Sequence, residues 1–267
     1  MTFLKHWKKS LNRIAPIFHW AFGVWCLVIF SSTAFAEIEI PLPVPRQTLE
    51  VGEQFIFDVF WMGVPVGEGS LEVKEKTRVR GREAFHIVAI AKTNDFLSRF
   101  YPIYDQVHSY VDVERFCSLE FSKKVREGNY RADEKIIFDP EKKKGFYESL
   151  KNGSRKEVET PSEVQDMLSA FYWFRRQAIQ VGKSARTVIS ADEQNWDLEI
   201  EVLRRETKEF RNGSVIETVV VEPQTRLKGI LYKRGRAWVY FSADEERIPV
   251  WVTIRTPFGP VFGVLRR

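Results

Sequence analysis

The chain has 267 residues, a length that fits one large folded domain. Of these residues 44% are hydrophobic and 14% aromatic, which is a higher apolar content than a disordered chain has. The first 36 residues hold four basic and no acidic side chains, so the formal net charge of +5 falls to +1 for the rest. This even balance argues against the concentrated basic face of a nucleic-acid-binding protein and leaves room only for a local basic patch.

The first 36 residues have the three parts of a bacterial signal peptide. A basic segment (residues 1–13) is followed by an apolar stretch (residues 14–30) and by Ala34-Phe35-Ala36, a small-x-small cleavage pattern. We therefore predict export, cleavage after Ala36 and a periplasmic location. An uncleaved anchor is the alternative, but the uninterrupted apolar core (residues 21–30) is shorter than the roughly 20 residues that cross a bilayer. We expect no stable membrane span after cleavage.

Residues 37–48 are predicted to form a short extended arm ahead of the folded domain. Pro41, Pro43 and Pro45 occur at every second position, and each proline lacks the N–H group that a central strand needs. The domain itself is predicted to cover residues 49–267, because no repeat and no change of composition divides them.

Beyond residue 49 the apolar side chains mostly alternate with a period of two, which is typical of antiparallel strands with one buried face. In FIFDVFW (residues 55–61) every second side chain shares a face, and RIPVWVTIR (residues 247–255) alternates in the same way. The turn signals between such segments predict about ten to twelve strands. The predicted fold is mainly β: a single curved antiparallel sheet, or a partly closed β-barrel, with one packed amphipathic helix.

That helix is predicted at about residues 161–180. Thr160 is a candidate N-cap, Pro161 suits the first helical position, and Glu163 would complete a capping box. Apolar side chains then recur at helical spacing along one face, and Gly182 is a typical end signal. Because one apolar helix face needs a partner, we expect the sheet to curl round it.

Several separated stretches resemble a bacterial exported family called domain of unknown function 3108. They are the hairpin FIFDVFWMGVPVGEGSLEV with its Trp-x-Gly-x-x-x-Gly spacing, the segments YPIYDQVHSYVD and GNYRADEKIIFD, the helix DMLSAFYWFRR, and the hairpin VYFSADEERIPVWVTIRTPFGPVFGVL. Their order and spacing fit across residues 49–266. The resemblance implies a periplasmic, mainly antiparallel β-protein. It implies no accepted activity and no catalytic residues, because none are assigned to the family.

The stretch FLSRFYPIYDQVHSYVD (residues 96–112) combines aromatic rings, a histidine and aspartates, and therefore has the composition of a site. On one strand, however, His108 and Asp112 would lie about 13 Å apart, and Asp105 would point to the opposite face. We therefore interpret the stretch as cross-strand packing. Its first aromatic residues are predicted to rim a cavity as ligand contacts; they are Phe100, Tyr101 and Tyr104.

The end of the helix supplies three more predicted ligand contacts. Tyr172, Trp173 and Arg176 are expected to border an apolar pocket, with the arginine holding an acidic head group. The alternative is an arginine at the edge of the core that reaches solvent. Only Cys117, His86 and His108 remain as Cys and His residues after residue 36, and their spacing predicts no metal site, no cofactor and no catalytic residue.

Three hypotheses about function follow. The first is a non-enzymatic binding or carrier protein for an apolar or amphiphilic, lipid-like ligand. The second is an interaction or assembly protein of the cell envelope, with a filled core and no small-molecule ligand. The third is a hydrolase that uses Asp105 or His108 with distant partners. A cavity would distinguish the first hypothesis from the second, and polar groups converging in that cavity would favour the third.

Overall fold

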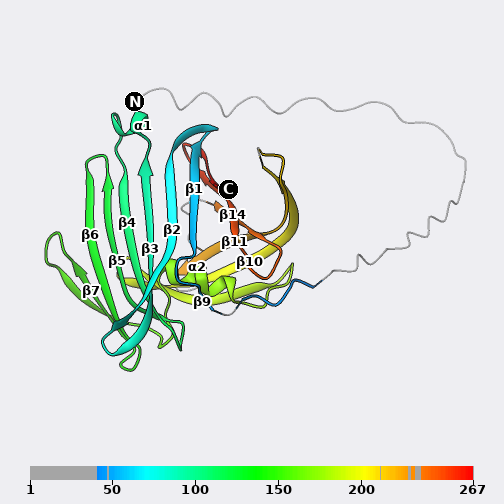
Figure 1. The fold of residues 1–267 in the computed structure, drawn as a ribbon. Coiled ribbons are helices and arrows are strands. Elements are labelled where there is room, and N and C mark those ends of the chain that lie inside the picture. Colours follow the sequence, from blue (N-terminus) through cyan, green and yellow to red (C-terminus); the bar gives the residue numbers. More distant parts are fainter. Residues whose placement is uncertain (1–40, 47, 211, 228–229, 232–235, 267) are drawn as a thin grey trace, which may run out of the picture. The chain divides into compact units, whose positions relative to one another are not determined.

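One antiparallel sheet accounts for most of the domain (Figure 1). The structure, a computed structural model, describes residues 41–46, 48–210, 212–227, 230–231 and 236–266. These residues belong to the second of two units of the chain, Ile40–Arg267. The predicted signal peptide (residues 1–36), its cleavage site and the start of the predicted arm lie outside the described residues.

The described residues contain fifteen strands and two helices. The first eight strands are β1 (Gln54–Trp61), β2 (Val64–Val79), β3 (Arg82–Thr93), β4 (Tyr104–Asp112), β5 (Ser118–Glu127), β6 (Tyr130–Asp139), β7 (Lys144–Ser149) and β8 (Arg155–Glu159). The remaining strands are β9 (Ser184–Ala191), β10 (Gln194–Glu209), β11 (Val215–Leu227), β12 (Ile230–Leu231), β13 (Arg236–Ser242), β14 (Pro249–Thr256) and β15 (Gly259–Leu265). The helices are α1 (Asp95–Ser98) and α2 (Met167–Arg175). The strands outnumber the predicted ten to twelve because elements such as β8 and β12 are too polar or too short to show an alternating pattern.

The strand order is β8-β7-β6-β5-β4-β3-β2-β1-β15-β14-β13-β11-β10-β9, and β12 pairs with β11. The two ends of the domain meet where β1 pairs with β15, with Phe57 opposite Leu265 and Trp61 opposite Val261. Strands β8 and β9 are the edges, so the sheet is not closed into a barrel. The predicted fold class, a single curved antiparallel sheet that encloses a helix, is confirmed in its open form.

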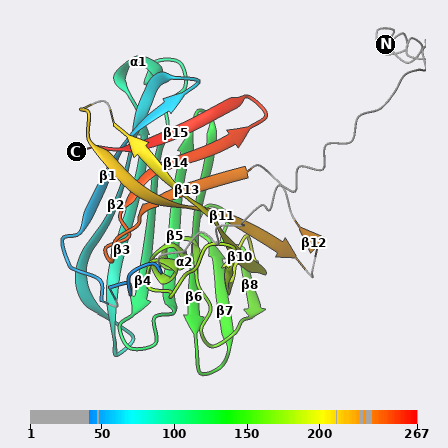
Figure 2. The same cartoon turned by 90° about the vertical axis from the view of Figure 1, so that its right-hand side faces the viewer.

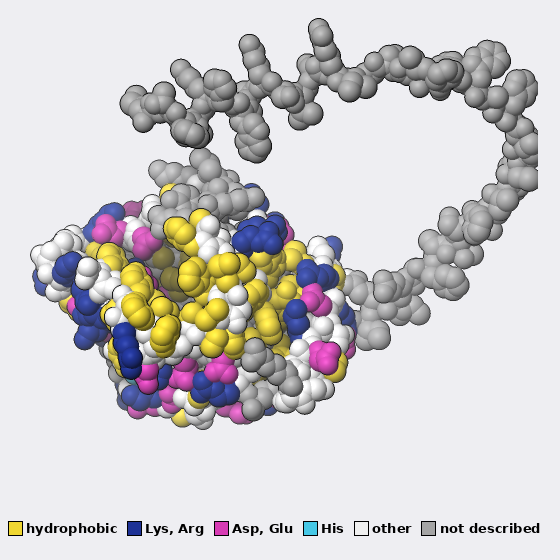
Figure 3. All heavy atoms as spheres, turned by 90° about the horizontal axis from the view of Figure 1, so that it is seen from above, with side chains coloured by type: hydrophobic (Ala, Val, Ile, Leu, Met, Phe, Trp, Pro, Cys, Tyr) yellow, Lys and Arg dark blue, Asp and Glu magenta, His cyan; other side chains and the backbone are white. Residues whose placement is uncertain are grey.

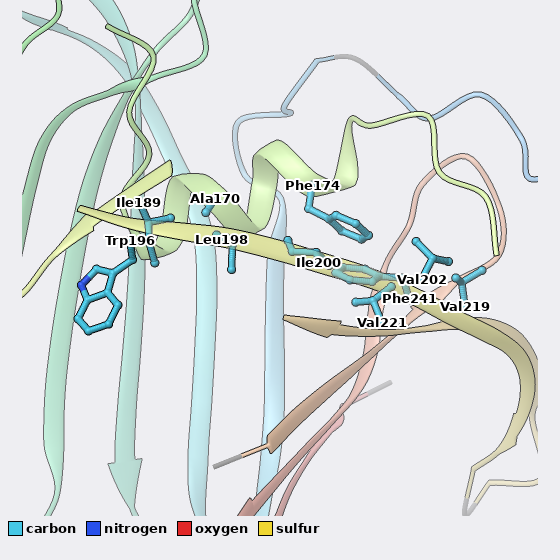
Figure 4. Packing of buried hydrophobic residues seen from close by; sticks show 10 residues of the cluster. All are labelled: Ala170, Phe174, Ile189, Trp196, Leu198, Ile200, Val202, Val219, Val221 and Phe241. Atoms are coloured by element: carbon cyan, nitrogen blue, oxygen red, sulfur yellow. The ribbon is translucent and has the colours of Figure 1, made fainter. Parts of the chain in front are cut away.

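Helix α2 lies inside the curve of the sheet (Figures 1 and 2). On one side, Ala170 and Phe174 pack against β9, β10, β11 and β13, where Ile200 and Phe241 belong to the same cluster (Figure 4). On the other side, Tyr172 packs against apolar residues of β1 to β4, including Phe55 and Ile87. Since both halves of the sheet bury their faces on one helix, that helix determines which face of the sheet is concave.

The helix is shorter than the predicted range of residues 161–180. Its N-cap is Asp166 instead of Thr160, and Ser169 instead of Glu163 completes the capping box. The residues before Asp166 are extended, because Gln165 donates its N–H to Val188 O (2.9 Å) and accepts from the Ser190 N–H (2.8 Å). These bonds to edge strand β9 take the place of the predicted first helical turns.

The described part of the proline-rich arm lies against the domain. The Arg46 N–H donates to Glu245 O at 3.0 Å, and the buried Arg247 guanidinium donates to Pro43 O at 3.3 Å. Pro45 is buried, whereas Val44 is 81% exposed. Residues 41–46 are therefore held at the turn between β13 and β14.

Candidate functional site

The concave face of the sheet continues beyond the core around α2. Alternate side chains of β1 point inward: Phe55 and Phe57 belong to or pack against that core, and Val59 and Trp61 follow along the strand. At about 3.3 Å per residue, Trp61 lies roughly 13 Å beyond Phe57. Val59 is half-buried and Trp61 is 43% exposed, so solvent reaches this level.

Small side chains line the neighbouring strands at the same level. Val59 pairs with Gly67 of β2 and with Gly263 of β15, and Gly69 pairs with Ala91 of β3, whose side chain is exposed. A Cβ atom on Gly69 would meet nothing closer than 3.9 Å, so Gly69 and the exposed Ala91 leave space here that larger side chains would fill. We call this region the upper concave face and define it by Val59, Gly69, Ala89, Ala91, Val252, Ile254, Val261 and Gly263.

The connection between β3 and β4 stands at the open end of this face, where Figure 1 shows α1. Asn94 caps α1 by accepting the Leu97 N–H at 2.8 Å, and its amide donates to Pro65 O in β2, also at 2.8 Å. These bonds hold the connection against β2. Two of the predicted ligand contacts, Phe100 (73% exposed) and Tyr101 (49% exposed), therefore stand at the open end.

Tyr104, the third residue predicted there, points elsewhere. It pairs with Lys92, and the alternation along β4 places it on the outer face with His108. Its ring is 48% exposed, and its hydroxyl accepts a hydrogen bond from Gln106 at 3.4 Å. We therefore leave Tyr104 out of the concave site, although it stays at the same end of the sheet.

The three residues predicted on the helix lie near the opposite end. Tyr104 and Ser109 are about 16 Å apart along β4, and Ser109 donates a 2.6 Å hydrogen bond to Asp166, the N-cap of α2. Tyr172 is fully buried in the core, where burial raises its pKa. The structure thus separates the six predicted residues into two groups, and Tyr172 is not available to a ligand in this conformation.

Trp173 and Arg176 do line one hollow, of about 470 Å³, beside the β4–β5 turn. The hollow is more polar than predicted, because Arg115, Arg186 and Gln165 also line it. The Arg176 guanidinium lies 3.8 Å from the centre of the Phe116 ring, and burial lowers its pKa. This matches the alternative of an arginine at the edge of the core more closely than an apolar pocket.

The residues considered for hydrolysis do not form one site. His108 lies on the outer face, where its Nδ1 is 3.0 Å from Nε2 of His86. Asp105 lies on the concave side and accepts the Arg126 N–H at 2.7 Å. Side chains on opposite faces of a sheet cannot act on the same bond. Among the described residues, no three His, Cys, Asp or Glu side chains are arranged to hold a metal ion.

A polar patch on the concave side was missed by sequence reasoning. Lys123 of β5 lies 2.9 Å from Glu134 of β6 and 3.2 Å from Asp192 in the β9–β10 turn. Burial works against the charge of Lys123, but these two carboxylates hold its pKa above the ordinary value. Burial also raises the pKa of the nearby Tyr147 to about 12. The patch connects the two halves of the sheet near their free edges, and alternation along β5 was its only signal.

The fold and the upper concave face define an open, curled antiparallel β-protein with a partly covered apolar interior. The chain belongs to the family described as "Protein of unknown function (DUF3108)", whose model matches residues 56–266, and the resemblance drawn from the sequence is confirmed. No curated protein matches the chain. Neither described helix is long and apolar enough to cross a membrane.

Two solved structures match the chain. One is a β-barrel-like protein of the domain of unknown function DUF1849 from Brucella abortus, with 11% identity and a TM-score of 0.52 over 81% of this chain and 96% of that one. The other is a protein of Bacteroides fragilis NCTC 9343 with a YmcC-like fold, with 12% identity and a TM-score of 0.34 over 85% and 99% of the two chains. At these identities the first similarity supports the architecture alone, and we draw nothing from the second.

Proposed function

We propose that this protein binds an apolar or amphiphilic ligand on its upper concave face and catalyses no reaction on it. The observation that carries the proposal is the row of small and half-exposed apolar residues on β3, β2, β1, β15 and β14, directly beyond the core around α2. A sheet that only encloses a packed core has no need of Gly69 and Ala91 at inward positions.

The shape of this face limits the ligand. The apolar part of the ligand would lie along β1 between Phe57 and Trp61, a length of about 13 Å. Its polar end would lie at the open end of the sheet, beside Phe100 and Tyr101, where water reaches both rings. A single-chain amphiphile fits this description, with its chain inside and its head group in solvent.

The second hypothesis, an envelope assembly protein with a filled core, is disfavoured by the same small residues. Export to the periplasm stays a prediction from residues 1–36, and a periplasmic location is consistent with the proposed ligand. The hydrolase hypothesis stays a prediction: Asp105 accepts the Arg126 N–H at 2.7 Å, and His108 lies beside His86 on the outer face.

The test is a substitution that fills the upper concave face. Ala91→Trp places a large ring at an exposed inward position of β3, and Lys92→Trp, the control, places the same ring on the outer face. The protein beginning at Glu37 is titrated with a fluorescent fatty acid, and circular dichroism checks that each variant is folded. We expect Ala91→Trp to weaken binding at least tenfold, about 1.4 kcal/mol, and Lys92→Trp to leave it unchanged.

Two results would contradict the proposal. One is a folded protein that takes up no fatty acid and yields no amphiphile when an organic extract of the purified protein is analysed by mass spectrometry. The other is equal binding by the protein and by Ala91→Trp, which would move the ligand away from this face.

A further inference from the structure

Five chain connections lie side by side at the open end of the sheet. The β14–β15 and β1–β2 turns are joined by the Trp61 indole N–H, which donates to Phe258 O at 3.0 Å. Asn94 ties the β3–β4 connection to β2, and the Gly128 N–H of the β5–β6 turn donates to Pro102 O at 2.8 Å. The β7–β8 turn follows, where the Leu150 N–H donates to Asp133 O at 2.8 Å.

We define these connections, each with two strand residues on either side, as the apolar rim. Its segments are residues 60–65, 92–105, 126–131, 148–156 and 255–260. Sixteen large hydrophobic side chains are exposed in the described part of the chain, and ten of them belong to the rim. They are Trp61, Met62, Val64, Phe96, Phe100, Tyr101, Tyr104, Tyr130, Leu150 and Phe258. Figure 3 views this end of the molecule and shows hydrophobic side chains gathered across it.

The rim also carries an excess of positive charge. Its segments hold eight basic and four acidic side chains. Three of the basic ones, Lys92, Arg126 and Lys156, form ion pairs with carboxylates outside the segments, so five basic side chains remain against the four acidic ones of the rim. Arg99, Arg131 and Lys151 are exposed among the aromatic residues. The rim therefore brings a few exposed basic side chains together with most of the exposed apolar ones.

We propose that the apolar rim docks onto an anionic lipid bilayer. Tyrosine and tryptophan suit the boundary between head groups and acyl chains, because each combines an apolar ring with a polar atom. Arginine and lysine beside them complement lipid phosphates. Exposed apolar side chains on five separate turns, four of which carry aromatic rings, can insert into a fluid head-group layer without a matching surface, which favours a bilayer over a protein partner. The rim includes the three turns at the open end of the upper concave face, between β1 and β2, between β3 and β4, and between β14 and β15.

The test measures flotation of the protein beginning at Glu37 with lipid vesicles. All core clusters and hydrogen bonds described above lie within residues 41–266, so this protein contains every element of the fold. Vesicles of phosphatidylcholine alone are compared with vesicles of phosphatidylcholine and phosphatidylglycerol at 7:3. We expect the protein to float with the anionic vesicles, and less of it to do so as salt screens the basic side chains.

Three variants separate the contributions. Phe96→Ser with Phe100→Ser removes two exposed rings, and at least tenfold weaker partitioning is expected. Arg99→Gln with Arg131→Gln and Lys151→Gln should reduce partitioning at least tenfold on anionic vesicles and little on neutral ones. Val51→Ser with Met167→Ser is the control, because these two apolar side chains are 52% and 62% exposed but lie outside the rim, and this variant should partition as the unchanged protein does.

Docking and ligand binding can fail separately. Ala91→Trp changes the upper concave face and leaves the rim intact, so it should still float. Failure of the folded protein to float with either vesicle would overturn docking, and so would an equal loss in the control variant or a partner protein that binds the rim while vesicles do not. None of these results bears on fatty-acid binding, which is measured without vesicles.

Discussion

His108 and His86 form a hydrogen-bonded pair on the outer face of β3 and β4. The ring of Tyr110 stacks on His86 at 4.4 Å, and Glu75 lies 3.3 Å from the other nitrogen of His86. A hydrogen bond between two imidazoles needs one nitrogen without a proton, so the pair excludes two fully protonated rings. Burial is the main cause that lowers the pKa of His108, and the nearby His86 and Lys74 lower it further. The charged groups that face this cluster from neighbouring strands are Lys74, Glu75, Glu120 and Lys135.

This lowered pKa predicts acid sensitivity at a single residue. A histidine in the unfolded chain has a pKa of about 6.5, which is above the pKa of His108 in the folded protein. Between these two pH values the unfolded chain binds more protons than the folded protein, so protonation favours unfolding. The stabilisation from neutral His108 is present above about pH 6.5 and is lost as the pH falls through the folded value. Urea unfolding between pH 7 and pH 5 should show a falling free energy of unfolding, and His108→Asn should flatten the slope. An equally steep slope in the variant would exclude His108 as its source.

At the scale of one element, strand β2 contains a bulge that brings two backbones together. The β1–β2 register shifts between Val59 and Phe60, because Val66 is an extra residue in β2. The Asn94 N–H donates to Val66 O at 2.9 Å, which holds the bulge against the end of β3. A Cβ atom on Gly67 would lie 2.2 Å from Lys92 O, whereas one on Gly69 would meet nothing closer than 3.9 Å.

Two alanine substitutions in β2 should therefore differ, although the two glycines are only two residues apart. Gly67→Ala forces a methyl group against backbone atoms and should lower the free energy of unfolding by about 1–3 kcal/mol. Gly69→Ala fits the available space and should change it by less than about 0.5 kcal/mol, or raise it slightly by restricting the unfolded chain. Urea unfolding of the two variants measures the difference, and equal stabilities would mean that the bulge relaxes without cost.

At the scale of the whole molecule, the local sequence pattern predicts most of the strands and helices but does not predict which of them pack against each other. Alternation in residues 55–61 and 247–255 identifies most of β1 and β14, since each strand buries one face along its own length. The start of α2 could not be found in this way, because Gln165, just before its N-cap, bonds to β9, an element that follows it in the chain. The burial of Tyr172 could not be predicted in this way either. Helical periodicity assumes that one side of the helix is buried, whereas a sheet that wraps the helix buries both sides. That Phe100 and Tyr101 contact a ligand stays a prediction, and their separation from Trp173 follows from the direction of β4, which no local pattern shows.

The two halves of the sheet are joined at α2 by one buried guanidinium. Arg175 donates to both carboxylate oxygens of Glu53, which precedes β1, at 2.7 Å each. It also donates to the carbonyl oxygens of Glu246 (2.9 Å) and Arg247 (3.1 Å), in the turn before β14. The Arg175 and Glu53 side chains are only 8% and 17% exposed, so water screens their charges weakly. This cluster holds the end of the helix to both ends of the domain at once.

Removing one charge from this cluster should destabilise the whole domain. Glu53→Gln leaves the Arg175 guanidinium buried beside a neutral group, and we expect it to lower the free energy of unfolding by about 2–4 kcal/mol. Glu148→Gln is the matched control, because Glu148 accepts two bonds from Arg155, which is 78% exposed, and the expected loss is below about 0.5 kcal/mol. Urea unfolding monitored by tryptophan fluorescence and by circular dichroism should give a single shared transition for Glu53→Gln, since α2 supports both halves. Two separated transitions would show instead that the halves of the sheet unfold independently.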